Sequence, residues 1–256
     1  MPSLDVFQFP CRDDNYGVLI RDAEAGVTAT IDAPELAAVE KALSDKGWSL
    51  THIITTHHHM DHVEGHDALK ARYGCTVIGP AGEADKIPGI DTQVKEGDTF
   101  KFGGFDVEVI ETPGHTLGQV NYHIPAAKIA FTGDTLFALG CGRIFEGTPA
   151  QMYGSMAKLK QLPADTTIYC GHEYTLANAK FAVSVDPDNA ALKARASEIE
   201  ALRADDKPTL PTTMALELET NPFLRFDDPA IRAHLGMESA SDEAVFTEIR
   251  RLKDNF

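Results

Sequence analysis

The chain has 256 residues, of which 43% are hydrophobic, and a formal charge of −16 from 23 basic and 39 acidic side chains. This length and composition allow a sizeable core, in one large domain or in one domain with an appendage. The negative charge repels nucleic-acid phosphates and anionic lipid surfaces, so we expect neither nucleic acid nor a membrane as a partner.

The sequence lacks the usual marks of a membrane-spanning or exported protein. No apolar run reaches the roughly 18 residues that a spanning helix needs, and residues 1–10 lack a basic segment followed by an apolar one. The four cysteines lie far apart and form no CxxC pair, which argues against a thiolate zinc site and against a disulfide framework. We therefore expect a cytoplasmic protein, and we expect it to be a monomer.

Short strands mixed with helices make up the first part of the chain, broken by Gly, Pro, Asn and Asp. The predicted strands cover residues 18–20, 27–31, 52–55, 76–78, 106–110, 120–123, 129–131 and 167–169. The predicted helices cover residues 34–45, 62–73 and 149–162. Pro34 is expected in the first turn of its helix, and Gly103-Gly104 predicts a hairpin turn. This mixture predicts a layered α/β core.

The last part of the chain is helical in pattern. Apolar side chains recur on one helix face over residues 189–203. Residues 242–253 predict a final helix, with Ser241 as its N-cap and acidic residues in its first turn. We therefore expect a catalytic domain over residues 1–174 and a smaller helical domain over residues 175–256.

Four candidate metal ligands, His57, His59, Asp61 and His62, directly follow an apolar strand. Alternate side chains of an extended segment share a face, so His57 and His59 should point together. Asp61 and His62 begin the next helix, whose turn can bring both back to the same cavity. The alternatives are a surface histidine cluster or an expression tag, but tags lie at chain ends and lack an interposed Asp.

Three further polar residues, His115, Asp134 and His172, follow strand-like runs at loop positions. Each is preceded by Gly, which lets backbone approach a crowded site closely. Taken singly, a His or Asp after a strand is more often an ordinary loop residue. Together with the first four residues, they indicate a metal site.

This pattern, HxHxDH followed by single His, Asp and His residues, resembles that of the metallo-β-lactamase fold superfamily. The resemblance extends to one of its families, glyoxalase II (hydroxyacylglutathione hydrolase). The similar segments are residues 14–16, 55–62, 112–116, 132–135, 140–147, 171–175, 221–225 and 250–254. It therefore covers essentially the whole chain, and it implies an α/β fold, an αββα sandwich with a C-terminal helical domain.

The resemblance also implies two divalent metal ions. One would be held by His57, His59 and His115, the other by Asp61, His62 and His172, with Asp134 bridging them. Oxygen and nitrogen donors without thiolate suit zinc first, and also iron or manganese. Asp32, at the end of a predicted strand, would orient a ligand histidine; the alternative is an ordinary turn residue.

The implied chemistry is hydrolysis by a metal-bridging hydroxide. Two metals roughly 3.5–4 Å apart can share a water and lower its pKa toward ~7. Asp134 would hold that spacing, and Asp61 would orient the nucleophile. A leaving thiolate, with a pKa near ~8.5, needs no dedicated general acid. The sequence has no Gly-x-Ser-x-Gly elbow, and Cys141 has no evident base, so we expect a packed thiol rather than a nucleophile there.

The substrate implied by the family is S-(2-hydroxyacyl)glutathione, such as S-D-lactoylglutathione, which gives glutathione and D-lactate in methylglyoxal detoxification. Arg143, Tyr174, Arg250 and Lys253 match family positions that contact glutathione. Arg250 and Lys253 share a helix face, although basic residues at a helix C-terminus also suit the macrodipole. Phe145 stands where many relatives have Tyr, and the missing hydroxyl bond to a charged group would cost ~1.5–3 kcal/mol.

Two other functions stay open. The first is a glutathione persulfide dioxygenase of the same superfamily with one iron, which the full second set of metal ligands and the long helical C-terminus disfavour. The second is a metal-binding protein without turnover, disfavoured because no ligand position is lost. A secreted β-lactamase and a nucleic-acid-processing enzyme are disfavoured by the absent export signal and by the charge of −16.

Overall fold

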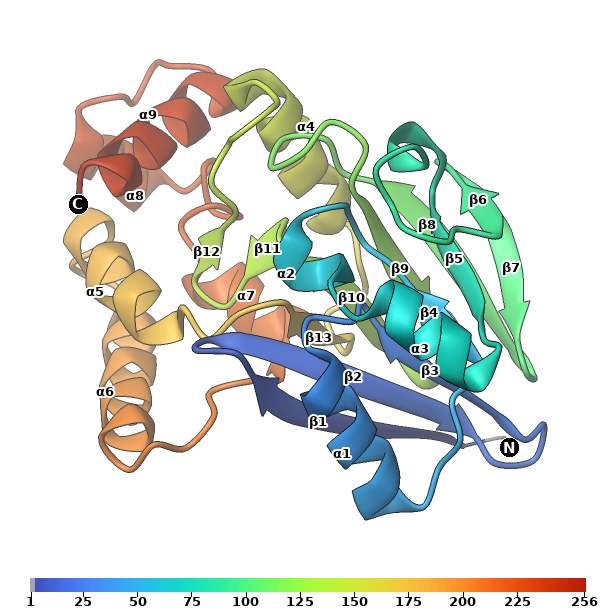
Figure 1. Ribbon diagram of the computed structural model, residues 1–256. Helices are drawn as coiled ribbons and strands as arrows, with labels where there is room; N and C mark the ends of the chain where they lie inside the picture. The colour runs from blue at the N-terminus through green and yellow to red at the C-terminus, as the bar shows by residue number, and fades with distance from the viewer. Residues whose placement is uncertain (1–2) are drawn as a thin grey trace. The chain divides into compact units, whose positions relative to one another are not determined.

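A computed structural model describes residues 3–256 of the chain, and its element order is shown in Figure 1. The described residues divide into two compact units. The first contains the chain up to Glu111 together with Leu117–Gly133, and the second contains Thr112–Thr116 together with Asp134–Phe256. No helix in this described part combines the length and the apolar character that crossing a membrane requires.

The first unit contains a mixed six-stranded sheet, with antiparallel and parallel strands. Its strands, in spatial order, are β1 (Leu4–Cys11), β2 (Asn15–Asp22), β3 (Val27–Ile31), β4 (His52–Ile54), β5 (Thr76–Pro80) and β6 (Thr92–Val94). The first three are antiparallel, and β3 to β6 are parallel. The helices α1 (Leu36–Lys46) and α3 (His66–Tyr73) supply Val39, Leu43 and Leu69 to a core that also contains Leu19 and Ile53.

Four antiparallel strands follow in the same unit. They are β7 (Thr99–Phe102), β8 (Phe105–Glu111), β9 (Val120–Ile124) and β10 (Ile129–Gly133), with the 3-10 turn η2 (Pro125–Ala127) between the last two. Another 3-10 turn, η1 (Ala81–Glu83), follows β5. Gly103, at a φ of 58°, forms the tight turn that the sequence predicts between β7 and β8. The buried Tyr122 hydroxyl of β9 donates to the Thr55 carbonyl at 2.6 Å, which ties these strands to the end of β4.

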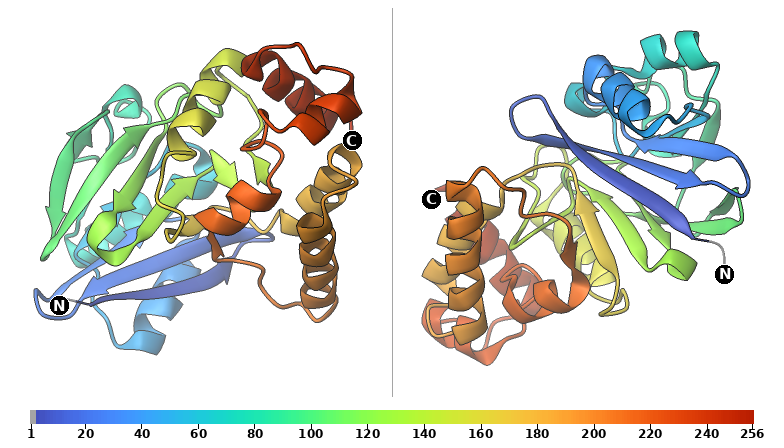
Figure 2. Two further views of the ribbon diagram at one scale, coloured as in Figure 1. Left: turned by 180° about the vertical axis from the view of Figure 1, so that it is seen from behind. Right: turned by 90° about the horizontal axis from the view of Figure 1, so that it is seen from below.

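Helices dominate the second unit. They are α4 (Pro149–Leu159), α5 (Thr175–Val185), α6 (Ala190–Ala204), α7 (Met214–Thr220), α8 (Pro229–Leu235) and α9 (Asp242–Asp254). The strands of this unit pair antiparallel, β11 (Leu136–Phe137) with β12 (Gly140–Cys141) ahead of α4, and β13 (Thr167–Cys170) with β14 (Thr212–Thr213). Figure 2 shows α5 and α6 side by side, and Ala182, Leu192 and Ile199 pack between them. Ser241 caps α9 as predicted, accepting from Ala244 N at 3.3 Å.

The single helix predicted over residues 62–73 is wrong. The structure has two helices there, α2 (Met60–Val63) and α3. The His62 carbonyl accepts from Ala33 N at 2.7 Å, and Gly65 N donates to the Ala33 carbonyl at 2.9 Å. Because these backbone groups bond the segment after β3, they cannot continue the helical ladder, and the chain restarts its helix at His66.

The predicted place of Pro34 is also wrong. The first helix begins at Leu36 with Glu35 as its N-cap, so Pro34 lies outside it. The Pro34 carbonyl instead accepts from Arg12 Nε at 2.7 Å, and the Glu35 carboxylate accepts from Arg12 N at 2.8 Å. The residues before the helix are thus bonded by Arg12, in the turn after β1.

The helix predicted over residues 149–162 ends earlier, at Leu159.

Candidate metal centre

The loop after β4 brings the first four candidate ligands close together. The ring centres of His57 and His59 lie 4.8 Å apart, and those of His57 and His62 lie 4.1 Å apart. Asp61 Oδ2 lies 3.6 Å from His62 Nε2. His57 and His62 are buried, which is unusual for polar side chains unless they are bound. These four residues are termed the first half-site.

Asp32 lies behind this loop and orients two of its histidines. It sits at a φ of 56°, a conformation that Asp tolerates better than most residues. Its carboxylate accepts from Thr56 N at 2.7 Å, from Thr56 Oγ1 at 2.8 Å and from His62 Nδ1 at 2.8 Å. The Thr56 hydroxyl also lies 3.0 Å from His57 Nδ1. Since Nδ1 of both rings is engaged, Nε2 of each carries the lone pair that a metal needs.

Two further residues support the first half-site, and neither was assigned a role from the sequence. Asn15 Nδ2 donates to Asp61 Oδ2 at 3.1 Å and to the Asp61 carbonyl at 3.3 Å. Glu83, only 1% exposed, accepts from His58 N at 2.7 Å, from His58 Nδ1 at 2.8 Å and from Gly118 N at 3.0 Å. Backbone partners of this kind leave no pattern in the sequence, so only the family-like segment 14–16 offered a signal.

The second half-site consists of His115, Asp134 and His172, and all three side chains are buried. Asp134 Oδ2 lies 3.3 Å from His115 Nε2 and 3.3 Å from His172 Nε2. His115 Nδ1 donates to the Arg143 carbonyl at 2.8 Å, which again leaves Nε2 as the donor atom for a metal. Two imidazoles and one carboxylate oxygen therefore converge on a common point.

Glycine makes this close approach feasible at Gly142. A Cβ atom there would lie 1.9 Å from the Asp134 carbonyl oxygen, so no side chain fits. Gly142 N donates to the Thr135 carbonyl at 2.9 Å, and the strand after the turn thus returns directly against Asp134. The glycine before His115, Gly114, is equally restricted, since its Cβ would lie 2.9 Å from Met152 Cβ.

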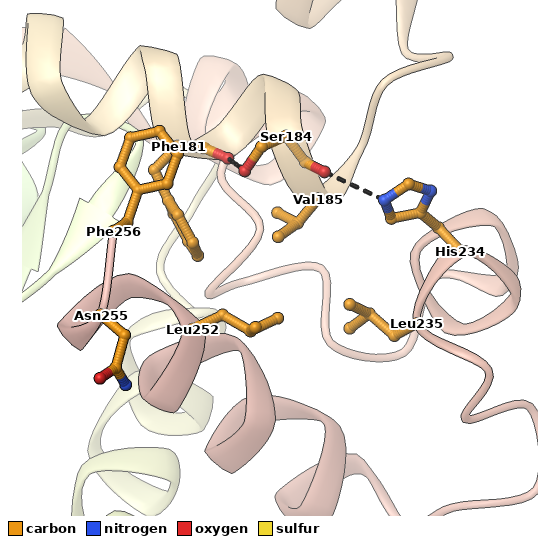
Figure 3. Close-up of a pocket in the computed structure, with 8 residues that line it drawn as sticks. All are labelled: Phe181, Ser184, Val185, His234, Leu235, Leu252, Asn255 and Phe256. Carbon is orange, nitrogen blue, oxygen red and sulfur yellow. Dashed lines mark hydrogen bonds between the residues drawn. The ribbon is translucent and has the colours of Figure 1, made fainter.

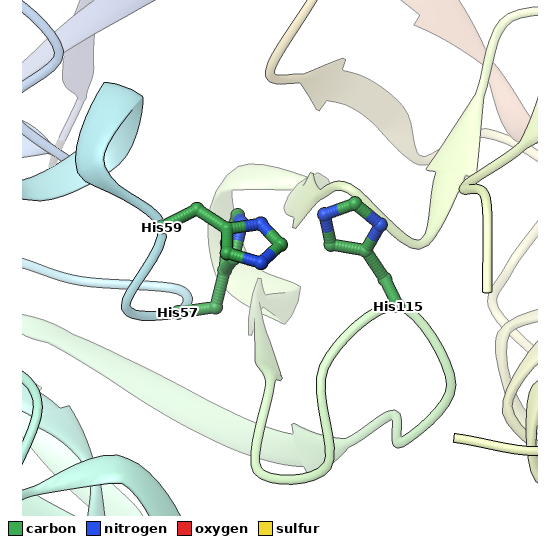
Figure 4. Close-up of side chains that lie close together, drawn as sticks. All are labelled: His57, His59 and His115. Atoms are coloured by element: carbon green, nitrogen blue, oxygen red, sulfur yellow. The ribbon is translucent and has the colours of Figure 1, made fainter. Parts of the chain in front are cut away.

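The chemistry of these donors fits a divalent metal ion. The first half-site offers three imidazoles and one carboxylate, and the second offers two imidazoles and one carboxylate. Figure 4 draws three of these imidazoles, those of His57, His59 and His115. Imidazole nitrogen and carboxylate oxygen, without thiolate, form the donor set that borderline metals such as zinc or iron accept.

The predicted basic residues gather around Asp254 in the second unit. Arg143 is exposed, with Nε 3.8 Å from Asp254 Oδ1, and Arg250 Nη2 donates to the same oxygen at 2.7 Å. Arg250 is only 5% exposed, and its Nη1 donates to the Cys141 carbonyl at 3.0 Å. Burial and the neighbouring Arg250 lower the pKa of Lys253.

Two aromatic rings lie against the second half-site. Tyr174 stacks on His172 with ring centres 4.7 Å apart and an interplanar angle of 3°. Phe145 packs edge-on against His115 at 5.2 Å. Both rings are exposed, Tyr174 by 38% and Phe145 by 62%. The two positions that the family resemblance connects with glutathione therefore flank two candidate metal ligands.

Cys141 and a pocket in the second unit carry no comparable chemistry. Burial raises the pKa of the Cys141 thiol to about 11, so the thiol is protonated at neutral pH. The pocket holds about 420 Å³ and is shown in Figure 3. Its lining is mostly apolar: Phe181, Ser184, Val185, His234, Leu235, Leu252, Asn255 and Phe256. No predicted site residue is among them.

Comparisons with known proteins indicate the family of the chain. A family model described as the metallo-beta-lactamase superfamily matches residues 24–172, and one described as the hydroxyacylglutathione hydrolase C-terminus matches residues 173–256. A hydroxyacylglutathione hydrolase of Brucella anthropi is 62% identical over 100% of this chain and 98% of its own, and that of Brucella ovis is 62% identical over 99% and 98%.

A solved structure, that of ETHE1 from Myxococcus xanthus, is 26% identical, with a TM-score of 0.69 over 96% of this chain and 90% of that chain. The predicted fold, a metallo-β-lactamase-type α/β domain with a C-terminal helical domain, is confirmed by these matches. The chain belongs to the hydroxyacylglutathione hydrolase (glyoxalase II) family of the metallo-β-lactamase superfamily.

Proposed function

We propose that this chain hydrolyses the thioester bond of S-(2-hydroxyacyl)glutathione, with S-D-lactoylglutathione as the expected substrate, to glutathione and a 2-hydroxy acid. One observation carries the proposal: Asp134 Oδ2 lies 3.3 Å from Nε2 of both His115 and His172, with the other nitrogen of His115 already bonded. One carboxylate oxygen within reach of two imidazole nitrogens is the arrangement of donors that a metal ion held by aspartate and histidine needs.

The proposed ligand sets follow the family. His57, His59 and His115 would hold one ion, Asp61, His62 and His172 the other, and Asp134 would contact both. When bound, two divalent ions supply Lewis-acid activation of a water and polarisation of the thioester carbonyl. Zinc suits these donors, and iron and manganese are alternatives that the ligand chemistry allows.

The chain's own residues would position the reactants. Asn15 donates to the Asp61 carboxylate and fixes its orientation. Asp61 could then accept a hydrogen bond from the attacking water and hold that water in one orientation. The departing glutathione sulfur is a weak base and leaves as a thiolate, so no protein acid is required. The oxygen added to the acyl carbon comes from water, and the released proton goes to solvent.

The glutathione part of the substrate needs positive charge, which the chain concentrates locally. Arg143, Tyr174 and Lys253 have exposed surface with which to contact it, whereas Arg250 would contribute its charge from a buried position. We assign catalysis to residues 1–174 and glutathione binding mainly to residues 175–256. The four free, buried cysteines suit a reducing cytoplasm.

The test is turnover of S-D-lactoylglutathione by the purified chain, followed as loss of the thioester and release of thiol, with metal content measured on the same sample. We expect hydrolysis and two metal ions per chain. One iron per chain, with oxygen uptake on glutathione persulfide and no thioester cleavage, would overturn the proposal. Bound metal without either activity would indicate the metal-binding protein without turnover.

A further inference from the structure

The turn between β11 and β12 lies between Asp134 and His172 in the sequence, soon after Asp134. Only Thr135 separates its first strand from Asp134, and only Gly142 separates its second strand from Arg143. Leu139 in this turn adopts a φ of 57°, which is uncommon for a non-glycine residue. A turn in this conformation persists only where its surroundings hold it.

Three side chains from the helical part of the unit bind the turn's backbone. Asn178 of α5 donates to the Ala138 carbonyl at 3.1 Å. Glu217 of α7 accepts from Leu139 N at 2.8 Å. Asn221, the C-cap of α7, donates to the Phe137 carbonyl at 3.1 Å and to the Gly140 carbonyl at 3.0 Å. Asn178, Glu217 and Asn221 are termed the turn clamp.

The turn clamp is buried, and two of its members bond each other. Glu217 and Asn221 are both 0% exposed, and Asn221 Nδ2 lies 3.0 Å from Glu217 Oε2. The other carboxylate oxygen accepts from Arg195 Nη2 at 2.5 Å and from Thr212 Oγ1 at 2.7 Å. Buried polar groups with this many partners have one arrangement, because losing any bond leaves an unsatisfied group.

The turn that the turn clamp binds also contacts the candidate metal ligands. The ring of Phe137 packs edge-on against His172 at 6.0 Å and against Tyr174 at 5.3 Å. After the second strand of the turn, the backbone of Gly142 lies directly against the Asp134 carbonyl oxygen. The turn therefore contacts one ligand through a ring and holds the other through the backbone.

We propose that Glu217, Asn221 and Asn178 are positioning residues that fix the Asp134–His172 pair, so that the helical part of the chain sets metal affinity as well as substrate binding. The inference rests on the proposed function only for the presence of metal at this pair. It does not depend on which substrate is turned over. A clamp that served only folding would change stability and leave the affinity of the folded protein for metal unchanged.

The experiment compares Asn221→Ala and Asn178→Ala with Asn189→Ala in the full chain. Asn189 is a matched control, because it caps α6 and bonds Asp186 and Glu219 in the same unit without contacting the turn. Each zinc-loaded protein is titrated with a chromophoric chelator, and its unfolding midpoint in urea is measured separately.

We expect the chelator concentration that removes half of the zinc to fall about 10-fold or more for both clamp variants, as for other residues that orient metal ligands, and less than about 2-fold for Asn189→Ala. Wild-type zinc retention in a folded Asn178→Ala protein, which loses one bond only, would overturn the inference even if Asn221→Ala does not fold. Failure of lactoylglutathione turnover by the wild type would overturn the proposed function instead, and would leave the chelator result interpretable.

Discussion

Three of the candidate ligand histidines present the same ring nitrogen to the site. Nδ1 donates to Asp32 in His62 and to the Arg143 carbonyl in His115, and it lies at Thr56 Oγ1 in His57. The partners differ in kind, but each fixes the tautomer in which Nε2 is the metal donor. The partners of these nitrogens are therefore as much part of the site as the ligands.

Asp32→Asn should weaken metal binding while keeping the side chain's shape. One oxygen can still accept from Thr56 N, but an amide NH2 replaces the oxygen that accepts from Thr56 Oγ1 and His62 Nδ1. We expect metal affinity to fall about 10–100-fold, measured by chelator competition. Asp22→Asn is the control, since Asp22 binds backbone N–H groups of turns and no ligand. Equal effects from both substitutions would remove Asp32 from the site.

The buried thiols give a second prediction at this scale. Burial raises the pKa of Cys170 to about 12 and that of Cys141 to about 11, against an ordinary value of 9.0. Because the folded-state pKa is higher, the stability that these thiols contribute is complete below pH 9.0 and declines as pH rises toward the folded values. We expect neither thiol to react with iodoacetamide at pH 8 until urea unfolds the chain, as mass spectrometry of the two peptides would show. Rapid labelling of native Cys141 would contradict this.

Helices and strands with a regular apolar pattern were predictable, and those held by long-range bonds were not. The strand over residues 27–31 matches β3 in full, because four of its five residues are β-branched and Asp32 ends it. By contrast, α5 begins after Tyr174 without a side-chain cap, and α7 has only seven residues with a buried Glu217 on it. Such elements depend on partners elsewhere in the chain, which local periodicity does not report.

The break between α2 and α3 can be tested at Gly65. A Cβ there would lie 3.1 Å from the Ala33 carbonyl oxygen and 3.3 Å from Ala33 Cβ, so the segment after β3 must shift. We expect Gly65→Ala to lower the free energy of unfolding by about 1–3 kcal/mol in urea denaturation. Gly154→Ala is the matched control, because this glycine lies inside α4 with nothing within 4 Å of a Cβ. That substitution should raise stability by about 0.5–1 kcal/mol; a loss at Gly154 equal to that at Gly65 would contradict the steric explanation.

For the whole molecule, the candidate site was more predictable than its support. The candidate ligands stand after strands, and three of them directly follow a glycine, so chemistry and spacing mark them in the sequence. Glu83 and the turn clamp bond to backbone atoms of distant segments, and Asn221 reaches residues more than 80 positions away. A polar residue of this kind looks the same in sequence as one on the surface, so its role appears only in the fold.

The negative charge of the molecule and its local basic cluster act on an anionic substrate in opposite directions. The net charge of −16 would repel glutathione's carboxylates over long range, whereas in the proposed site Arg143, Arg250 and Lys253 would attract them at close range. Salt screens exposed charges beyond about 8–10 Å, so at physiological ionic strength the local cluster should decide binding.

Two substitutions that change the net charge by the same amount distinguish the long-range effect of net charge from the effect of the local cluster. Arg143→Ala and Arg251→Ala each remove one positive charge, but Arg251 is an exposed residue that pairs with Glu248 on its own helix. If the cluster governs binding, Arg143→Ala raises KM for lactoylglutathione about 10-fold or more, from the loss of a bond between charged groups, with kcat changed much less. Arg251→Ala should leave KM within about 2-fold, as exposed ion pairs of this kind contribute little. Equal rises in KM for the two variants would mean that the field of the whole molecule controls access, and would take Arg143 out of the proposed glutathione site.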